Sequence, residues 1–225
     1  MKGTNRFLIS LICAVVGVAL SACGLEKMTN LSPPKFGAFS SPDKTFTFRK
    51  TPENGDNTDP DEQFFRGFEL YYKIYTQLQE TDKNITDFDL LSKKFHRVSP
   101  QNVKPKPLIP VPIDERNGTN FDIVVNFSGL TDSNVEVIYL GLDFNIRRGV
   151  SYTETEFLDE YKHFDYSIPS AFTSGDADVT TDVWTDIENS ESVVLVLYAL
   201  SYGKKDFIYD VYSMAVYLGE IDIRF

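Results

Sequence analysis

The sequence is poor in the residues that build metal and redox centres. It contains two cysteines, Cys13 and Cys23, and two histidines, His96 and His163. Neither histidine has a second histidine or cysteine at the spacing that zinc ligands need, so we expect no zinc site. The chain also lacks the serine elbow of hydrolases, the glycine-rich phosphate loops and the dinucleotide-binding fingerprint. We therefore expect no cofactor, and the sequence shows no familiar catalytic constellation.

Basic residues are scarce relative to acidic ones. The chain has 22 lysines and arginines against 33 aspartates and glutamates, which gives a formal net charge of −11. A surface of this sign repels the phosphate backbone of nucleic acids and the headgroups of anionic lipids. We therefore expect no nucleic-acid partner.

Long apolar runs are missing, apart from one near the N-terminus. Lys2 and Arg6 form a positive head, residues 7–19 carry no charge, and small residues precede Cys23. This order is typical of a secretory signal peptide. The apolar run of 13 residues is shorter than the roughly 20 that a membrane-spanning helix needs. We predict that residues 1–22 are a removed leader, and without its two basic residues the net charge becomes −13.

Residues 20–23, Leu-Ser-Ala-Cys, resemble the bacterial lipobox. The resemblance implies cleavage just before Cys23, a diacylglyceryl group on its thiol and a further acyl chain, such as palmitate, on the new amino terminus. Several acyl chains anchor a protein far more firmly than one. We therefore expect an exported protein with a membrane as its partner through the acyl chains on Cys23. Gly24, which replaces the aspartate of inner-membrane retention, favours the outer membrane if the cell has two membranes.

The alternative is an ordinary signal peptide with a cysteine at the cleavage point by chance. Because Cys13 lies in the leader, the mature chain forms no internal disulfide and depends on a packed core, for which about 200 residues suffice. Residues 23–34 are polar and end in two prolines, which predicts a lipidated tether. Residues 35–225 are expected to form one β-sandwich domain with an insertion at about 80–190.

Beyond the tether, apolar residues recur with a period of two, which predicts half-buried strands. In residues 67–76, one face carries Phe68, Leu70, Tyr72 and Ile74, and the other carries Glu69, Tyr71, Lys73 and Tyr75. The same alternation predicts strands at residues 45–49, 121–127 and 138–146, and a closing pair at 211–218 and 220–225. Residues 193–200 are apolar throughout and predict a central strand. The chain is expected to be mainly β.

Two short helices and a proline-rich segment are expected between the strands. Thr86 or Asp87 can cap a helix that ends near Phe95, and Thr153 with Glu156 resembles a capping box. Residues 99–112 contain five prolines, which cannot donate to a β ladder. They form either a domain linker or an edge segment that crosses the sandwich. The few strands expected in residues 35–98 favour the edge segment.

Two stretches resemble strands of a fibronectin type III domain. "FRGFELYYKIY", residues 65–75, resembles the third strand, and "VLVLYALSYGKKDFIYDVYSMAVYLG", residues 194–219, resembles the last two strands with their turn. The resemblance implies a fibronectin type III-like or immunoglobulin-like β-sandwich with a long insertion that contains extra strands and one or two short helices. Such folds host adhesion and recognition modules more often than enzymes.

Three aromatic residues are candidates for recognition. Tyr71 and Tyr75 share a face with charged residues, which predicts a face that is at least partly wet, and Trp184 lies alone in an acidic loop. Flat rings beside hydrogen-bonding groups serve in sugar and protein recognition. The alternative that we favour for the tyrosines is cross-strand pairing that only stabilises the sheet. Trp184 can instead plug one end of the sandwich.

The acidic loop at residues 174–188 contains weak candidates for calcium ligands, Asp176, Asp178 and Asp182. Oxygen ligands at alternate positions suit calcium, but the spacing is not that of an EF-hand. Acidic loops usually just keep a protein soluble, so we expect no metal.

These features predict a lipid-anchored cell-envelope protein that acts without catalysis, as a binding or adhesion module with a protein or glycan partner. One alternative is a structural subunit of an envelope assembly complex. A less favoured alternative is an envelope glycan hydrolase, which would need two facing carboxylates about 5 to 10 Å apart.

Overall fold

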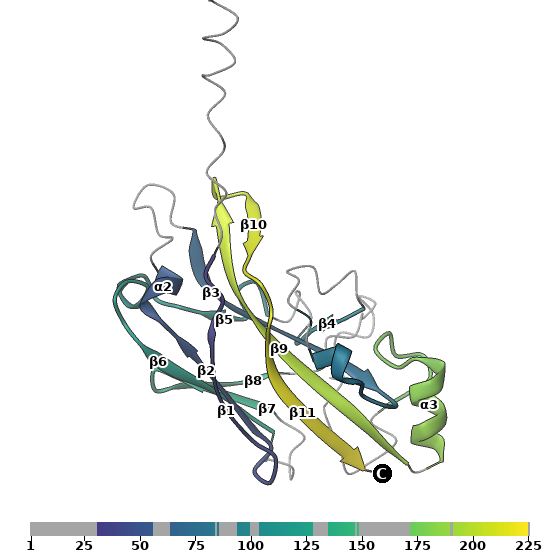
Figure 1. The fold of residues 1–225 in the computed structure, drawn as a ribbon. Coiled ribbons are helices and arrows are strands. Elements are labelled where there is room, and N and C mark those ends of the chain that lie inside the picture. Colours follow the sequence, from purple (N-terminus) through teal and green to yellow (C-terminus); the bar gives the residue numbers. More distant parts are fainter. Residues whose placement is uncertain are drawn as a thin grey trace, which may run out of the picture.

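The structure is a computed structural model that describes residues 31–55, 64–83, 85, 94–99, 104–127, 135–146, 148, 172–189 and 191–224. The chain is mainly β, as predicted, with two antiparallel sheets and two α-helices among these residues (Figure 1). The helices are α2 (Pro52–Gly55) and α3 (Thr181–Glu188). No helix in this part of the chain is long and apolar enough to cross a membrane.

The first sheet has five strands in the order β1–β2–β6–β7–β8. Their bounds are β1 (Lys35–Ser40), β2 (Thr45–Lys50), β6 (Phe121–Asn126), β7 (Val135–Tyr139) and β8 (Leu142–Ile146). The predicted alternation appears in β2, where Phe46 and Phe48 are buried, and in β6, where Ile123 and Val125 are buried. These side chains form one wall of the main core.

The second sheet is built on two long strands, β3 (Phe65–Tyr75) and β9 (Ser192–Lys205), which pair antiparallel. On the other side of β9 lie β10 (Tyr209–Tyr212) and β11 (Val216–Arg224). Beyond β3 lie two short edge strands, β4 (His96–Arg97) and β5 (Ile109–Pro110). The prediction of a central strand at residues 193–200 is confirmed, because β9 has neighbours on both edges and is buried along most of its length.

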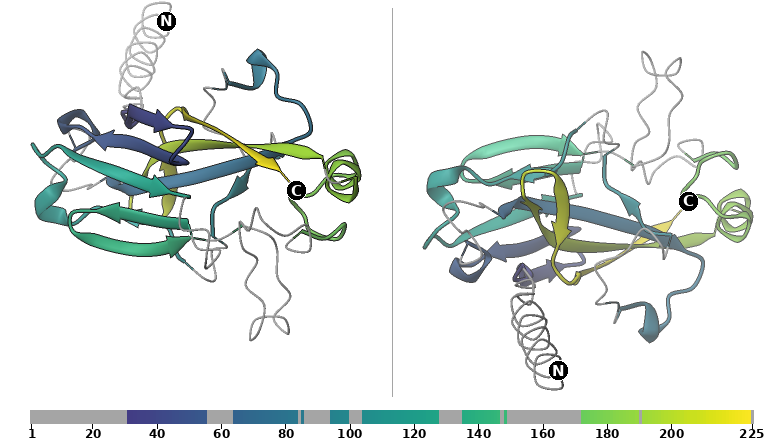
Figure 2. Two further views of the ribbon diagram at one scale, coloured as in Figure 1. Left: turned by 90° about the horizontal axis from the view of Figure 1, so that it is seen from below. Right: turned by 90° about the horizontal axis from the view of Figure 1, so that it is seen from above.

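The main core lies between the two sheets. The rings of Phe48 from the first sheet and Phe68 from the second meet edge to face, with centroids 5.4 Å apart. The helix α3 adds Val183 and Ile187 to the same core. Figure 2 shows α3 at the outer end of the second sheet, away from β6, β7 and β8. A second, smaller apolar cluster covers the opposite face of β3 and β9.

Two strand predictions are wrong. Residues 138–146 do not form one strand, because the chain turns between β7 and β8 at Leu140 and Gly141, whose φ angles are 49° and 72°. Residues 211–218 and 220–225 do not form a pair, because residues 216–224 are the single strand β11. The break after β10 has a physical cause: the Ser201 N–H donates to the hydroxyl of Ser213 instead of to a backbone carbonyl.

The proline-rich segment is attached to the second sheet through β5. Its residues Ile109 and Pro110 pair with Phe68 and Gly67 of β3, which is the arrangement of an edge segment. A Cβ atom on Gly67 would lie 2.1 Å from the Ile109 carbonyl oxygen, so only glycine permits this approach. Of the helices expected near residues 86–95 and 153–164, nearly all residues lie outside the described part of the chain, and Phe95 directly precedes β4.

Candidate functional site

The β9–β10 hairpin ends in an exposed apolar tip. Phe207, Ile208 and Tyr209 are 65%, 71% and 64% exposed. The turn closes through a bond of 3.1 Å from the Ile208 N–H to the Lys205 carbonyl oxygen. Three consecutive exposed apolar residues are unfavourable on a soluble surface unless they have a function. We call residues 207–209 the hairpin tip.

The backbone of this turn is strained. Asp206 and Phe207 have φ angles of 51° and 61°, in the left-handed region that glycine and asparagine favour in such turns. A phenylalanine in this conformation costs roughly 1–2 kcal/mol relative to a right-handed one. Strained residues of this kind concentrate at functional sites. The ring of Phe207 is therefore held at the tip against the preference of its own backbone.

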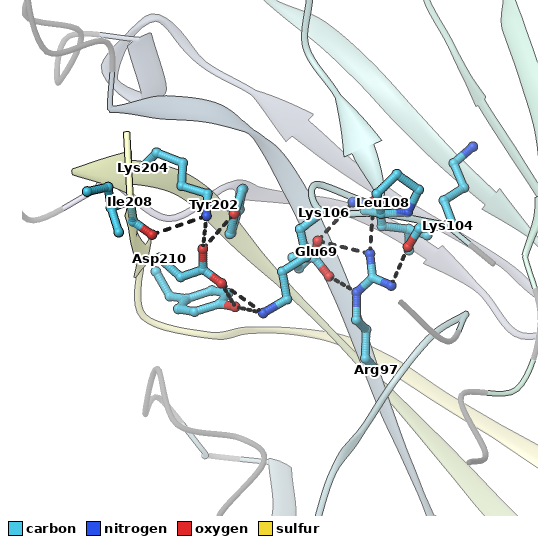
Figure 3. A network of polar contacts seen from close by, with 11 residues as sticks. Glu69, Arg97, Lys104, Lys106, Leu108, Tyr202, Lys204, Ile208 and Asp210 are labelled. Carbon is cyan, nitrogen blue, oxygen red and sulfur yellow. Dashed lines mark hydrogen bonds and ion pairs between the residues drawn. The ribbon is translucent and has the colours of Figure 1, made fainter. Parts of the chain in front are cut away.

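A polar network holds the base of the hairpin, as Figure 3 shows. The carboxylate of Asp210 on β10 forms ion pairs with Lys204 Nζ at 2.6 Å and with Lys106 Nζ at 3.1 Å. It also accepts a bond of 2.8 Å from the Tyr202 hydroxyl. Lys106 donates to the hydroxyl of Tyr212 in addition. The hairpin is thus tied both to β9 and to the proline-rich segment.

The protonation states in this network are fixed near neutral pH. Burial acts to raise the pKa of Asp210, but the hydrogen bonds from Lys204, Tyr202 and Lys106 outweigh it and lower the pKa to about 2. Burial raises the pKa of Tyr202 and of Tyr212. The carboxylate therefore stays charged and the phenols stay protonated, which suits a structural or binding role better than proton transfer.

A buried ion pair lies beside this network on the same face of β3 (Figure 3). Glu69 is fully buried and accepts two bonds from Arg97 and one of 2.8 Å from the Leu108 N–H. Arg97 also donates to three backbone carbonyls, those of Ser99, Lys104 and Pro105. The pair therefore fixes the backbone of the proline-rich segment, because the prolines prevent this backbone from forming a β ladder. Lys106 connects it in sequence to the Asp210 network.

The weak calcium candidates are placed in two different surroundings. Asp176 and Asp178 enclose Arg148, with bonds of 2.9 Å from Nη2 to Asp176 and 2.8 Å from Nε to Asp178. The guanidinium supplies there the positive charge that calcium would bring. Asp182 lies apart from them, exposed in the first turn of α3. Within the described ranges, no group of three His, Cys, Asp or Glu residues could hold a metal ion.

The recognition candidates are less accessible than expected. Tyr71 does share a face with Glu69, but it is only 3% exposed, so the prediction of a wet face is wrong there. The reason is the second apolar cluster, in which Phe95, Tyr198 and Ala215 pack with Tyr71. Tyr75 is half-buried at the edge of this cluster, with Lys73 Nζ 4.7 Å from its ring centroid.

Trp184 lies on α3 and not in a loop. Thr180 caps this helix by accepting a bond from the Val183 N–H. The indole ring packs partly buried against the main core, beside Ile187. This position agrees with the alternative in which Trp184 plugs one end of the domain.

Sequence reasoning missed the hairpin tip. The signal was present in residues 204–210, where three large apolar residues follow two lysines and an aspartate in a turn without glycine. We interpreted these residues only as a connection between two strands. In the structure Lys205 pairs with Tyr209, which leaves only residues 206–208 for the turn. The side chains of residues 207–209 are exposed there.

Arginines hold the buried carboxylates of this domain in place. In the described part of the chain, every buried carboxylate is ion-paired with an arginine: Glu69 with Arg97, and Asp176 and Asp178 with Arg148. The close guanidinium favours the charged form of each carboxylate, but at Glu69 burial outweighs Arg97 and raises the pKa above its ordinary value. The chain matches no known protein family, and no curated protein or solved structure shows significant similarity to it.

Proposed function

We propose that the protein is an exported lipoprotein, held in the cell envelope by acyl chains on Cys23, whose β domain acts by binding and not by catalysis. The observation that carries this proposal is the resemblance of residues 20–23 to the lipobox, after a positive head and an uncharged apolar run. The partner is a protein or glycan of the envelope, and the acidic charge of the chain disfavours nucleic acid. In a cell with two membranes, Gly24 favours the outer one.

The domain that the anchor carries is fibronectin type III-like in this proposal. Support comes from the order of strands in the second sheet, where β3 pairs with β9 and β9 pairs with β10 and β11. Immunoglobulin-like sandwiches place their third, sixth and seventh strands in this order. The strands β1, β2 and β6 then correspond to the other sheet, so β6 belongs to the sandwich although it lies within the insertion expected at about 80–190. The elements β7, β8 and α3 belong to the insertion. Domains with this architecture often serve recognition, which is an analogy of fold.

The anchor is tested by substituting each cysteine in the full-length chain. Cys23→Ser should abolish incorporation of a palmitate analogue and leave the protein unprocessed or soluble, because thioether formation needs the sulfur atom. Cys13→Ser is the matched control and should change neither property. The measurements are metabolic labelling, detergent phase partition and the mass of the N-terminal peptide. Normal maturation and full detergent partition of Cys23→Ser would refute the proposal.

A structural subunit of an envelope complex is the second candidate function. It is favoured by the β7–β8 hairpin, where Ile138, Leu140 and Leu142 are exposed. Within the described residues β8 pairs only with β7, so its outer edge can accept a strand from another chain. Replacement of Leu140 and Leu142 by serine should then remove a partner that co-purifies from mild detergent, with the melting temperature unchanged. Hydrolysis of an envelope glycan by the purified protein would instead support the hydrolase alternative.

A further inference from the structure

The chain enters the folded domain at the hairpin end of β9. Leu31 is buried beside Gly203, where an added Cβ atom would lie 3.1 Å from Leu31 Cδ1. The Ser32 carbonyl oxygen accepts bonds of 2.6 Å from the Ser201 hydroxyl and from the Asn54 side-chain amide. These contacts fix the start of the domain two residues before β9 ends at Lys205.

The length of chain between Cys23 and Leu31 limits which part of the domain can meet the membrane. Eight residues span at most about 28 Å when fully extended. The hairpin tip begins four residues beyond Gly203, so it extends about 13 Å further in the direction of the turn. Ser192, at the other end of β9, lies eleven residues back, or about 36 Å, which is beyond the reach of the tether. Figure 1 shows the β9–β10 turn and α3 at opposite ends of the molecule.

We propose that the hairpin tip inserts into the lipid surface that holds Cys23, so that the domain stands on the membrane with β10 facing it and α3 facing away. This inference rests on the proposed acylation of Cys23. The tip presents Phe207 and Ile208 for burial among acyl chains and Tyr209 for the interface, where tyrosine is enriched in membrane proteins. Transfer of three adjacent exposed apolar side chains from water into lipid is favourable.

The charge at this end suits a lipid surface better than the rest of the acidic chain. Residues 204–210 contain two lysines and two aspartates and are therefore neutral overall, in a chain with a net charge of −11. Arg66 adds a positive charge here, with its Cζ atom 5.8 Å from the ring centroid of Phe207. An uncharged tip with a guanidinium beside it avoids the repulsion that headgroup phosphates exert on acidic surfaces.

The hairpin is also stiff enough to hold one orientation. Asp210 at its base is bound by Lys106, Lys204 and Tyr202, and the Ile208 carbonyl oxygen accepts a bond of 3.4 Å from Lys204. The tip is thus connected to both β9 and the proline-rich segment. Insertion of the tip then orients the whole domain and not only a loose loop.

The single tryptophan of the chain permits a direct test. The acylated full-length protein is reconstituted into phosphatidylcholine vesicles whose acyl chains are brominated and quench tryptophan at close range. In the wild type the only tryptophan is Trp184 on α3, and its fluorescence should be unchanged. In the variant Trp184→Phe/Tyr209→Trp the tryptophan lies in the hairpin tip, and most of its fluorescence should be lost.

A further variant separates the tip from the tether. Phe207→Gly/Ile208→Ser, added to Trp184→Phe/Tyr209→Trp, removes two apolar side chains, and glycine suits the left-handed backbone at position 207. The turn should therefore keep its fold, which a melting curve checks. This variant should still float with the vesicles through Cys23 but should regain its fluorescence. Quenching that persists would show that the tether alone brings the hairpin close, and would overturn the insertion.

The remaining outcomes distinguish the two proposals. If the protein floats with the vesicles and neither the tryptophan at position 209 nor Trp184 is quenched, the insertion is wrong and the lipoprotein proposal stands. Equal quenching at both positions would overturn the fixed orientation, because the domain would then lie flat. A protein that does not float and has an unmodified Cys23 would overturn both proposals.

Discussion

A buried arginine packs against each of the two faces of β3. The two guanidinium groups have different kinds of partner. On the face of Glu69, Arg97 pairs with one carboxylate and donates to three backbone carbonyls. On the face of Tyr72, Arg148 lies between the two carboxylates of Asp176 and Asp178. The Tyr72 hydroxyl donates to Asp178 at 2.6 Å and completes this second cluster.

The difference reflects what each cluster fixes in place. Arg97 holds the backbone around Pro105. The prolines of this segment prevent a regular β ladder, so the backbone carbonyl oxygens need hydrogen-bond donors from elsewhere. Arg148 compensates the buried negative charges of Asp176 and Asp178. Burial acts to lower the pKa of Arg148, but the two carboxylates outweigh burial and raise this pKa. The cluster of Arg97 therefore fixes the proline-rich segment. The cluster of Arg148 reduces the free-energy cost of burying the two aspartates.

The largest expected effect is that of removing Arg148, which is fully buried. Arg148→Met should lower the free energy of unfolding by about 5 kcal/mol, at the upper end of the range for broken buried pairs, because two carboxylates lose their cation. Arg148→Lys is the control and should lose less. Equal denaturant midpoints for Arg148→Met and the wild type at pH 7 would contradict the importance of this cluster.

Removal of Arg97 should have a smaller effect. Arg97→Met leaves only Glu69 without its cation, and Glu69 keeps the bond from the Leu108 N–H, so we expect a loss of about 3 kcal/mol. The double variant Arg97→Met/Glu69→Leu should be more stable than Arg97→Met, because no charge is then orphaned. Hydrogen exchange should accelerate around residues 104–108 in both variants. Unchanged exchange there would show that Arg97 does not organise the segment.

The strands could be predicted from the sequence because alternation is a local property. Phe46 and Phe48 in β2, and Phe68 to Ile74 in β3, reveal their buried face without reference to a partner strand. The turn at Leu140 was missed although Gly141 was a signal for it, because the apolar alternation continues through the turn. The break after β10 depends on a bond between Ser213 and Ser201, which no local pattern announces.

The arginine clusters could not be predicted, because their partners are distant in sequence. Arg148 and Asp178 are 30 residues apart, and Glu69 and Arg97 are 28 apart. The sequence shows Asp176 and Asp178 only as an acidic loop with weak candidates for calcium ligands, and it gives no sign of their guanidinium partner. Tyr71 was expected to be partly wet for a similar reason, since the apolar cluster that covers it comes from other segments.

A modest effect is expected for Asp210, which links the face of Arg97 to the hairpin. Its pKa in the folded protein is about 2, against an ordinary value of 3.8, so the contribution to stability is complete above pH 4 and is lost as the pH falls toward 2. Because the site is partly exposed, we expect at most about 1 kcal/mol from it. Asp210→Asn should therefore lower the melting temperature by about 2–4 °C at pH 7. The difference from the wild type should vanish near pH 2.

The control for this prediction is Asp114→Asn, a change at an exposed carboxylate of the short helix at Ile113–Glu115. It should leave the melting temperature unchanged at both pH values. A difference between Asp210→Asn and the wild type that is the same at pH 2 and pH 7 would mean that the charge of Asp210 does not stabilise the hairpin.

The smallest effect, and the only one expected to be stabilising, concerns Tyr75 on the same face as Glu69. Its hydroxyl oxygen is buried without a hydrogen-bond partner among the described residues, and burial raises its pKa. A buried hydroxyl without a partner carries a desolvation penalty, so Tyr75→Phe should raise the free energy of unfolding by up to about 1 kcal/mol. Tyr198→Phe on the neighbouring strand β9 should instead lower it by about 1 kcal/mol, because the Tyr198 hydroxyl donates to the Asp82 carbonyl oxygen at 2.5 Å. Urea midpoints measured on both variants give the two signs directly. A lower midpoint for Tyr75→Phe would contradict the desolvation penalty assigned to this hydroxyl.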